Sequence, residues 1–360
     1  MLISQKSKEI IDSCRFCWMC RHICPIGNAT GQERNTARAR ALGLSLVERG
    51  AEPLSEVADN VYECALCGAC TKECVTGWDP VQFTKEVRLE LAMNGKTPDY
   101  INKLIENIMQ TGNVYGATEI CPDLKKAIAA HSAKTDTLLF LGKDAIYKSC
   151  KSAKNAIELL EKAGVSFTVL ADEPDSGYAM NFLVGAADET KKIMENCAKA
   201  LDYKTIIAYD PADAKTFLRD YKEWDIPLKG NVVTFPSFVV DLIKDGKLNP
   251  KKSDMNCTVQ DNHNLSRELE EFEPIRAIIS ACADVKEMLL YNKDTMLAGN
   301  LIMNEYMPDV MKAVAHERVI NAKNMGAEVI VTESPAEYEL LSADGSIQVM
   351  SVEEVVLQCL

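Results

Sequence analysis

The chain has 360 residues, of which 47% are hydrophobic, and a formal net charge of -13 at pH 7. This length and composition predict a globular protein of two or three domains. The acidic balance argues against nucleic acid as a partner, because neutralising phosphates requires a surplus of Lys and Arg. No apolar run reaches the ~18 residues of a membrane-spanning helix, and the first residues lack the apolar core of a signal peptide. We therefore expect no membrane span and a cytoplasmic location.

Cysteine is the most informative residue type in the sequence. Fourteen cysteines are many for a cytoplasmic chain, in which disulfides are disfavoured and metal binding or catalysis is the usual explanation. The six that are scattered singly are expected to be small buried hydrophobic residues, although Cys121 in the linker could be a redox thiol. The other eight form two copies of the spacing C-x-x-C-x-x-C-x-x-x-C, at Cys14, Cys17, Cys20 and Cys24, and at Cys64, Cys67, Cys70 and Cys74.

This repeated spacing is typical of bacterial ferredoxins with two four-iron, four-sulfur (4Fe-4S) clusters. Three thiolates separated by two residues each can reach three irons of one cube, and in two-cluster ferredoxins the last cysteine of each motif binds the other cluster. Zinc is the competing interpretation, but zinc sites rarely add a third and a fourth cysteine in this way. The pattern predicts one cluster on Cys14, Cys17, Cys20 and Cys74, and a second on Cys64, Cys67, Cys70 and Cys24.

Helical patterns accompany the second motif. Residues 36–49 form one, which ends at Gly50, and residues 80–94 form another, which ends at Gly95. Small ferredoxins lack a helical insertion of this length, so the pattern indicates a helical ferredoxin domain.

Arginine and aromatic side chains near the motifs could interact with the clusters. Arg34, Arg38 and Arg40 could offset the negative charge of the thiolate cubes or dock an acidic partner, although a solvated helix face is the simpler alternative. Trp18 and Tyr62 flank the motifs, and we expect both to shield the clusters from water.

From about residue 136 the sequence changes to short β-rich runs that alternate with helical stretches, which predicts parallel sheets. A second such unit begins near Cys257 and includes a strand at 328–332. The units also share a strand that runs into a proline-containing turn, at 209–213 and at 332–337, which indicates an internal duplication. The strands expected in the first unit are 137–141, 166–170, 205–209 and 231–235.

The cluster motifs, the segment 111–116 and the duplicated α/β units together resemble the cysteine-rich CCG family. This family includes heterodisulfide reductase subunits and the iron-sulfur subunits of glycolate oxidase and anaerobic glycerol-3-phosphate dehydrogenase. The resemblance spans nearly the whole chain. It implies an α+β multidomain fold, in which a helical two-cluster ferredoxin domain (1–115) and a linker (116–135) precede two α/β CCG-like repeats (136–250 and 251–360).

The chain departs from the family in the duplicated region. Active members carry Cys-Cys-Gly and Cys-Pro-x-Cys motifs there, which in the heterodisulfide reductases hold noncubane clusters. Every expected thiolate is missing here, so we expect no noncubane cluster and no heterodisulfide reduction by that route. The corresponding places are Lys143, 175–177 and 210–213 in the first repeat, and His263, 296–299 and 334–337 in the second.

Polar residues stand at several of these places. Asp210, Asp213, His263 and Glu337 could bind a hard metal or a small substrate if their side chains converge. The alternative is that they are ordinary turn and helix-cap residues that follow strands. No catalytic residue is identified from the sequence.

The leading functional hypothesis is an iron-sulfur electron-transfer subunit of a cytoplasmic oxidoreductase complex. The chain has no G-x-G-x-x-G fingerprint for a dinucleotide, so FAD is expected only on a partner subunit. The expected partners in this hetero-oligomer are a flavoprotein dehydrogenase, of the hydroxy-acid type, and a second electron carrier. Two alternatives remain: a self-contained reductase whose α/β pair binds a substrate or hard metal, and an adaptor protein whose clusters are structural.

Overall fold

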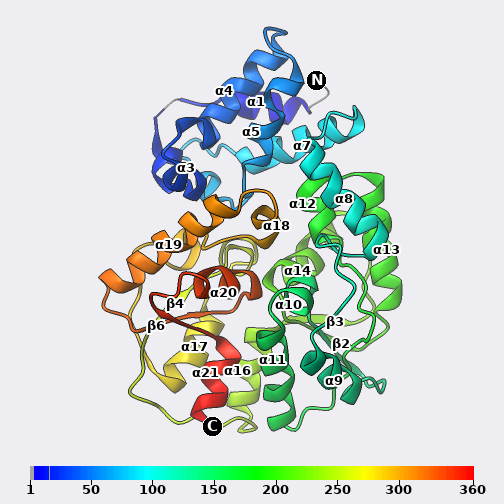
Figure 1. Ribbon diagram of the computed structural model, residues 1–360, viewed down its shortest axis with the longest axis vertical. Helices are drawn as coiled ribbons and strands as arrows, with labels where there is room; N and C mark the ends of the chain where they lie inside the picture. The colour runs from blue at the N-terminus through cyan, green and yellow to red at the C-terminus, as the bar shows by residue number, and fades with distance from the viewer. Residues whose placement is uncertain (1–3, 16) are drawn as a thin grey trace. The chain divides into compact units, whose positions relative to one another are not determined.

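A computed structural model describes residues 4–15 and 17–360 of the chain (Figure 1). It confirms a multidomain fold of helices and parallel strands. Two compact units are present, and each combines segments that are distant in the sequence. The first unit comprises Met1–Gly116, Ala179–Lys192 and Ile302–Val314, and the second comprises Ala117–Tyr178, Ile193–Leu301 and Ala315–Leu360.

The first unit is helical. Its N-terminal part contains α1 (Gln5–Asp12), α2 (Met19–Ile23), α3 (Pro25–Thr30), η1 (Glu33–Asn35), α4 (Ala37–Glu48), η2 (Leu54–Val57), α5 (Ala58–Tyr62), α6 (Ala69–Glu73), α7 (Pro80–Met93) and α8 (Asp99–Thr111). Four later helices contribute to it in whole or in part, namely α12 (Tyr178–Val184), α13 (Asp188–Ala200), α18 (Leu301–Asn304) and α19 (Pro308–Asn324).

The two helices predicted beside the second motif are confirmed as α4 and α7. The Thr36 hydroxyl accepts a hydrogen bond from the Ala39 N–H and caps α4, which satisfies one of the free amides of its first turn. At α7 the Asp79 carboxylate accepts from the N–H groups of Val81 and Gln82, and Pro80 occupies the first helical position.

Arg88 of α7 is fully buried and joins three parts of the first unit. Its guanidinium donates to the carbonyl oxygens of Val61 (3.0 Å) and Cys64 (2.6 Å), and to that of Phe182 in α12 (2.6 Å). Hydrogen bonds from a charged donor contribute about 1.5–3 kcal/mol each, more than neutral ones do. Arg88 therefore fixes the backbone at the first cysteine of the second motif.

The second unit contains two parallel sheets (Figure 1). The first has the strand order β1 (Thr137–Phe140), β2 (Thr205–Ala208), β3 (Asn231–Thr234). The second has the order β5 (Asp284–Val285), β4 (Asn256–Gln260), β6 (Val329–Thr332), β7 (Gln348–Ser351).

One expected strand is wrong. The segment 166–170 makes only an isolated bridge, between Leu138 and Thr168, beside the first sheet. The Thr168 hydroxyl donates to the Ala133 carbonyl oxygen (2.8 Å) and accepts from the Thr135 N–H (2.8 Å). These local bonds anchor the segment at one point, and a regular ladder does not continue from it.

Helices flank both sheets. The predicted linker 116–135 contains one of them, α9 (Pro122–Ala130), which packs against α11. The helices of the first half are α10 (Lys143–Tyr147), α11 (Cys150–Lys162), α14 (Pro211–Lys215), η3 (Thr216–Asp220), α15 (Tyr221–Glu223) and α16 (Phe235–Lys244). Those of the second half are η4 (Asn264–Glu268), α17 (Glu273–Cys282), η5 (Asn292–Asp294), α20 (Pro335–Ser342) and α21 (Val352–Cys359).

The two halves of the second unit are built alike where their central strands end. After β2, Asp210 caps α14 by accepting from the Ala212 N–H, and after β6, Ser334 caps α20 by accepting from the Glu337 N–H. Proline occupies the first position of both helices. Both halves also contribute to one apolar core, which includes Ile207 of β2 and Val331 of β6.

Among residues 4–15 and 17–360, no helix combines the length and the apolar character that crossing a bilayer requires.

A buried hydrogen bond joins the two halves of the second unit. The Tyr209 hydroxyl donates to Glu353 Oε1 over 2.7 Å, and burial raises the pKa of Glu353 to about 7. Because the folded-state pKa lies above the ordinary value, the protonated carboxyl stabilises the fold at low pH, and this contribution is lost as the pH rises through about 7.

We therefore expect Glu353→Gln to flatten the pH dependence of the unfolding free energy between pH 5 and 8. Glu353 contributes at most about 3 kcal/mol to the pH-dependent part of the unfolding free energy. Urea unfolding followed by circular dichroism measures it, with Glu328→Gln at an exposed position as the matched control. If the unfolding free energy of Glu353→Gln depends on pH as steeply as that of the wild type, the raised pKa of Glu353 is contradicted.

Candidate iron-sulfur site

The two cysteine motifs fold into the same local structure. In the first, Trp18 precedes α2 with φ 73° and ψ -4°, and in the second, Gly68 precedes α6 with φ 72° and ψ 0°. The last cysteines also match, since Cys24 has φ -76° and ψ 110° and Cys74 has φ -76° and ψ 114°. Glycine adopts the left-handed conformation freely, whereas in tryptophan it costs about 1 kcal/mol.

Because α2 packs against α6, the two motifs lie side by side. Each motif then contributes its last cysteine to the other motif's cavity. The first cavity is lined by Cys14, Cys17, Cys20 and Cys74, and the second is lined by Cys24, Cys64, Cys67 and Cys70. Each cavity thus brings together the four cysteines of one predicted ligand set, and cluster binding by them stays a prediction.

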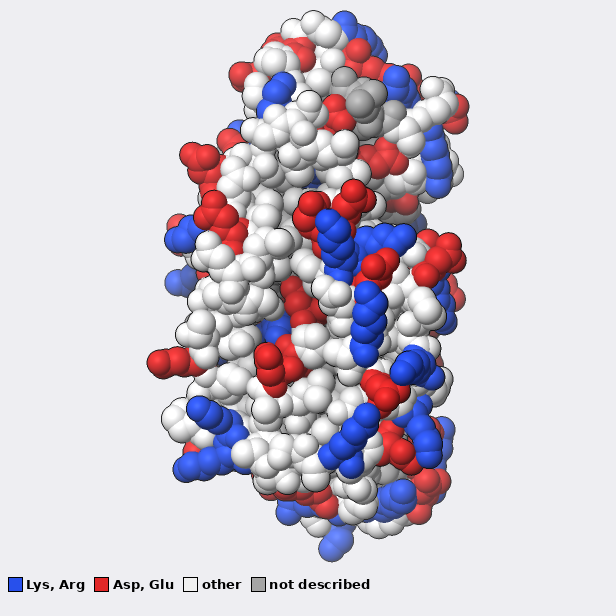
Figure 2. Space-filling model, turned by 90° about the vertical axis from the view of Figure 1, so that its right-hand side faces the viewer, with Lys and Arg blue, Asp and Glu red and all other residues white. Residues whose placement is uncertain are grey.

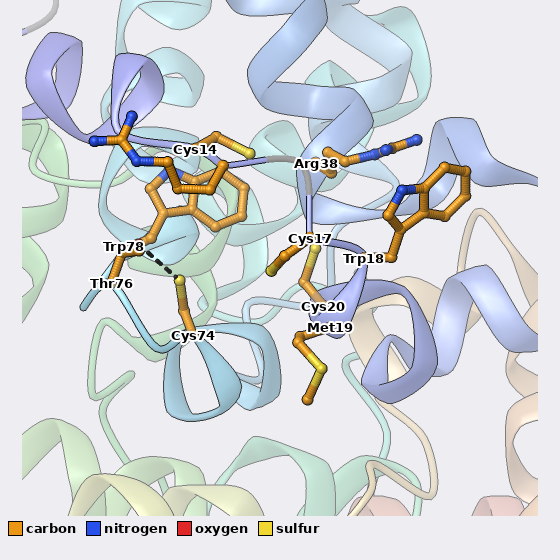
Figure 3. A pocket seen from close by; sticks show the side chains of 10 residues that line it. Cys14, Cys17, Trp18, Met19, Cys20, Arg38, Cys74, Thr76 and Trp78 are labelled. Atoms are coloured by element: carbon orange, nitrogen blue, oxygen red, sulfur yellow. Dashed lines mark hydrogen bonds between the residues drawn. The ribbon is translucent and has the colours of Figure 1, made fainter.

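The first cavity has a volume of about 360 Å³ and opens to the surface at the exposed Cys17. In Figure 3 the sulfur atoms of Cys17, Cys20 and Cys74 point toward a common space. The Thr76 hydroxyl lies 3.2 Å from the Cys74 sulfur. Burial raises the pKa of Cys74, but hydrogen bonds from Thr76 and from the backbone N–H of Trp78 outweigh it, so the net pKa is lowered.

Trp78 provides a test of what this cavity accommodates. Its side chain is 2% exposed and lines the cavity, and its Nε1–H has no hydrogen-bond partner within the described part of the chain. A buried donor without a partner costs free energy, and sulfur atoms of a bound cluster are suitable acceptors. The donor set and the unpaired N–H therefore both fit an iron-sulfur cluster.

The second cavity also measures about 360 Å³ and is more apolar. Its lining includes the buried side chains of Pro25, Ile26, Ala37 and Ala69. Backbone amides face two of its sulfur atoms: the Gly27 N–H donates to Cys24 and the Leu66 N–H donates to Cys64, each over 3.4 Å. Amide hydrogen bonds of this kind tune the potential of a cluster.

Burial strongly affects the thiols of the second cavity. It raises the pKa of Cys24 to about 11 and raises that of Cys70 well above its ordinary value. Thiolates are the metal-binding form, so both groups lose a proton when a metal centre binds.

Arg40 is the buried cation beside this cavity, with 3% of its surface exposed. Its guanidinium donates to the carbonyl oxygens of Asn60 (2.9 Å) and Asn35 (2.7 Å). Burial lowers the pKa of Arg40, but nearby thiolates, Cys64 first, outweigh burial and raise it overall. Arg40 is thus held as a permanent positive charge next to the second set of cysteines.

The other side chains singled out from the sequence have different surroundings. Arg34 forms an ion pair with Glu63, and Arg38 lines the first cavity and forms an ion pair with Glu33. Tyr62 is fully buried. Trp18 lines the first cavity and is 42% exposed, so its shielding of a cluster from water stays a prediction.

Trp78 is the buried tryptophan of the first cavity, and no motif in the sequence pointed to it. The available signal was its place four residues after Cys74, just before the cap of α7.

In the α/β unit the structure brings Asp210 and Asp213 together, both buried and both next to Gly142. A Cβ atom at Gly142 would lie 2.3 Å from Asp213 Oδ2, so only glycine fits there. Burial raises the pKa of both carboxyls well above their ordinary value. Asp210 also caps α14, and Asp213 accepts from the Ser176 hydroxyl.

His263 and Glu337 have other neighbours. Burial lowers the pKa of His263 well below its ordinary value, with Arg267 and Lys215 as the nearby charges. Glu337 Oε1 accepts from the N–H of Ala298 (3.1 Å), and burial raises the pKa of this carboxyl to about 7. Binding of a substrate or hard metal by the four predicted residues stays a prediction.

Across residues 4–15 and 17–360, no three His, Cys, Asp or Glu side chains lie close enough together to hold one metal ion. A zinc ion binds sulfur at about 2.3 Å, which draws its ligands tightly together. A 4Fe-4S cube instead takes each thiolate on a different iron, so its four cysteines need not meet at one point.

The scattered cysteines follow the structural expectation in four cases. Cys197, Cys257, Cys282 and Cys359 are buried. Cys121 and Cys150 are half-buried, and burial raises the pKa of Cys150 to about 11, with Cys121 beside it.

Comparison with known proteins agrees with this geometry. The family described as a 4Fe-4S dicluster domain matches residues 10–78. A similar relative is a subunit of the dihydromethanophenazine:CoB–CoM heterodisulfide reductase of Methanosarcina acetivorans, 25% identical over 96% of this chain and 92% of the relative. The corresponding protein of Methanosarcina mazei is 24% identical over the same shares. An uncharacterized iron-sulfur protein of Methanocaldococcus jannaschii is 20% identical over 93% of this chain and 68% of its own length.

The chain therefore carries a 4Fe-4S dicluster domain and is homologous, across nearly its full length, to these heterodisulfide reductase subunits of the CCG family.

Proposed function

We propose that the protein is an electron-transfer subunit that carries two 4Fe-4S clusters. The first is held by Cys14, Cys17, Cys20 and Cys74, and the second by Cys24, Cys64, Cys67 and Cys70. The observation that carries the proposal is the pair of cavities, each lined by four cysteines drawn from both motifs. A 4Fe-4S cluster supplies reversible one-electron transfer when bound.

The residues around the cavities give the two sites different roles. The lining of the second cavity is mainly apolar, whereas Cys17 exposes the first site to solvent. The packing of α2 against α6 keeps the two sites adjacent. The domain would then pass electrons between two adjacent clusters, one of which lies at the surface.

The partners are proposed on chemical grounds. The α/β unit lacks the cysteines of the Cys-Cys-Gly motifs, so we propose no noncubane cluster and no heterodisulfide chemistry for it. The relatives are named as subunits of a reductase, which supports a hetero-oligomer. We propose a flavoprotein dehydrogenase of the hydroxy-acid type, which holds the FAD, and a second electron carrier, in a cytoplasmic complex.

Single substitutions can test whether the last cysteine of each motif binds the cluster of the other motif. Anaerobically prepared protein should contain about eight irons. Cys74→Ser should change the same electron paramagnetic resonance (EPR) signal as Cys14→Ser, and Cys24→Ser the same signal as Cys67→Ser, because each pair lines one cavity. If Cys74→Ser instead alters the signal affected by Cys67→Ser, the proposed ligand sets are wrong.

Arg40 should set the potential of the second site. A buried positive charge stabilises the added electron, so Arg40→Gln should lower the reduction potential of that site and leave the first nearly unchanged. An EPR-monitored redox titration measures both potentials. Arg34→Gln is the matched control, because Arg34 is exposed and pairs with Glu63. Equal shifts in the two variants would contradict a special role for Arg40.

The isolated chain should be reduced and oxidised reversibly, with bleaching of its cluster absorption, but should not oxidise a hydroxy acid. This follows if the dehydrogenase is a separate subunit. Steady-state assays with hydroxy acids and an artificial electron acceptor provide the measurement. Robust turnover by the chain alone would favour a self-contained reductase.

A further inference from the structure

We propose that the exposed rim of the first cavity is the docking surface for a redox protein with an acidic patch, and that Trp18 is its central contact. This proposal rests on the proposed electron-transfer function and names the kind of partner that function requires. The rim consists of Arg15, Trp18 and Met19, which line the cavity, Arg21, which lies beside Trp18, and Val75, which stands between two lining residues.

Trp18 is placed where the fold prefers glycine. Its φ of 73° matches the 72° of Gly68, the residue at the same place in the second motif. The left-handed conformation is unfavourable for a bulky side chain, and the ring is 42% exposed rather than packed in a core. Strain of this kind persists where it serves a function outside the fold.

Apolar side chains continue from Trp18 along the rim. Met19 is 43% exposed and Val75, next to Cys74, is 82% exposed. Tryptophan is among the residues that dominate binding energy at protein interfaces. Burying this patch on a partner would also exclude water from the edge of the first cavity.

The charged groups of the rim are basic. Arg15 and Arg21 are exposed and form no ion pair within the described part of the chain. Arg21 lies 5.2 Å from the centre of the Trp18 ring, and Arg38 covers the ring at 3.9 Å. On the face of the molecule in Figure 2, by comparison, acidic and basic side chains are interspersed.

These charges determine which partner fits. An acidic patch is attracted by the basic rim, while the net charge of -13 repels it from the chain as a whole. The rim therefore favours an acidic partner in one orientation, with its own redox centre facing Cys17. Cys17 is the exposed cysteine of the first set.

The test uses the full-length, cluster-loaded protein with an acidic ferredoxin as the probe and a basic cytochrome c as the counter-probe. Binding is measured by isothermal titration calorimetry with all proteins oxidised, at low and high salt. Trp18→Gly and Arg21→Glu are the two variants. Trp18→Gly installs the residue that the second motif carries, so it relieves strain and should leave the fold intact. Arg49→Glu is the matched control, at an exposed arginine at the other end of α4 from Arg38, about 16 Å away.

We expect each rim variant to weaken ferredoxin binding at low salt by roughly tenfold or more, with Arg49→Glu close to wild type. The effect of Arg21→Glu should shrink at high salt, because added ions screen exposed charges. The proposal is overturned if the wild-type protein binds no ferredoxin, if it prefers cytochrome c, or if the rim variants bind as the control does. Iron content and reduction by dithionite are measured on the same samples, so loss of the clusters themselves is recognised as failure of the proposed function.

Discussion

The structure of the first unit depends on the exchange of one cysteine between two motifs. Cys24 is the last cysteine of the first motif but lines the second cavity, and Cys74 is the last cysteine of the second motif but lines the first. Neither cavity can form unless α2 and α6 are packed together, with Arg88 holding the backbone at Cys64. Binding of metal centres would therefore stabilise the fold of this unit directly, because the ligands come together only when it is folded.

The two sites share a backbone geometry but differ in their surroundings. At the position before the short helix the second motif has glycine, and its cavity is apolar, while the first motif has an exposed tryptophan next to arginines. Arg40 is buried beside the second site, whereas Arg38 at the first site forms an ion pair with Glu33. The duplicated motif thus forms one site with an apolar lining and a buried arginine, and one site with an exposed cysteine.

Much of this arrangement could be predicted from the sequence because it depends on local signals. The cysteine spacing predicts which cysteines line each cavity, and caps such as Thr36 and Asp79 determine where α4 and α7 begin. Other features depend on tertiary contacts that no local pattern encodes. The exposure of Trp18, the burial of Trp78, the reduction of 166–170 to one bridge, and the return of Ala179–Lys192 and Ile302–Val314 to the helical unit are of this kind.

The most direct test of two adjacent clusters is the EPR spectrum of the protein as it is reduced stepwise. Two cubes held by interleaved cysteines should interact magnetically, so the fully reduced spectrum should be broadened and split relative to the half-reduced one. A fully reduced spectrum that is the simple sum of two independent signals, or one signal from about four irons per chain, would contradict the account.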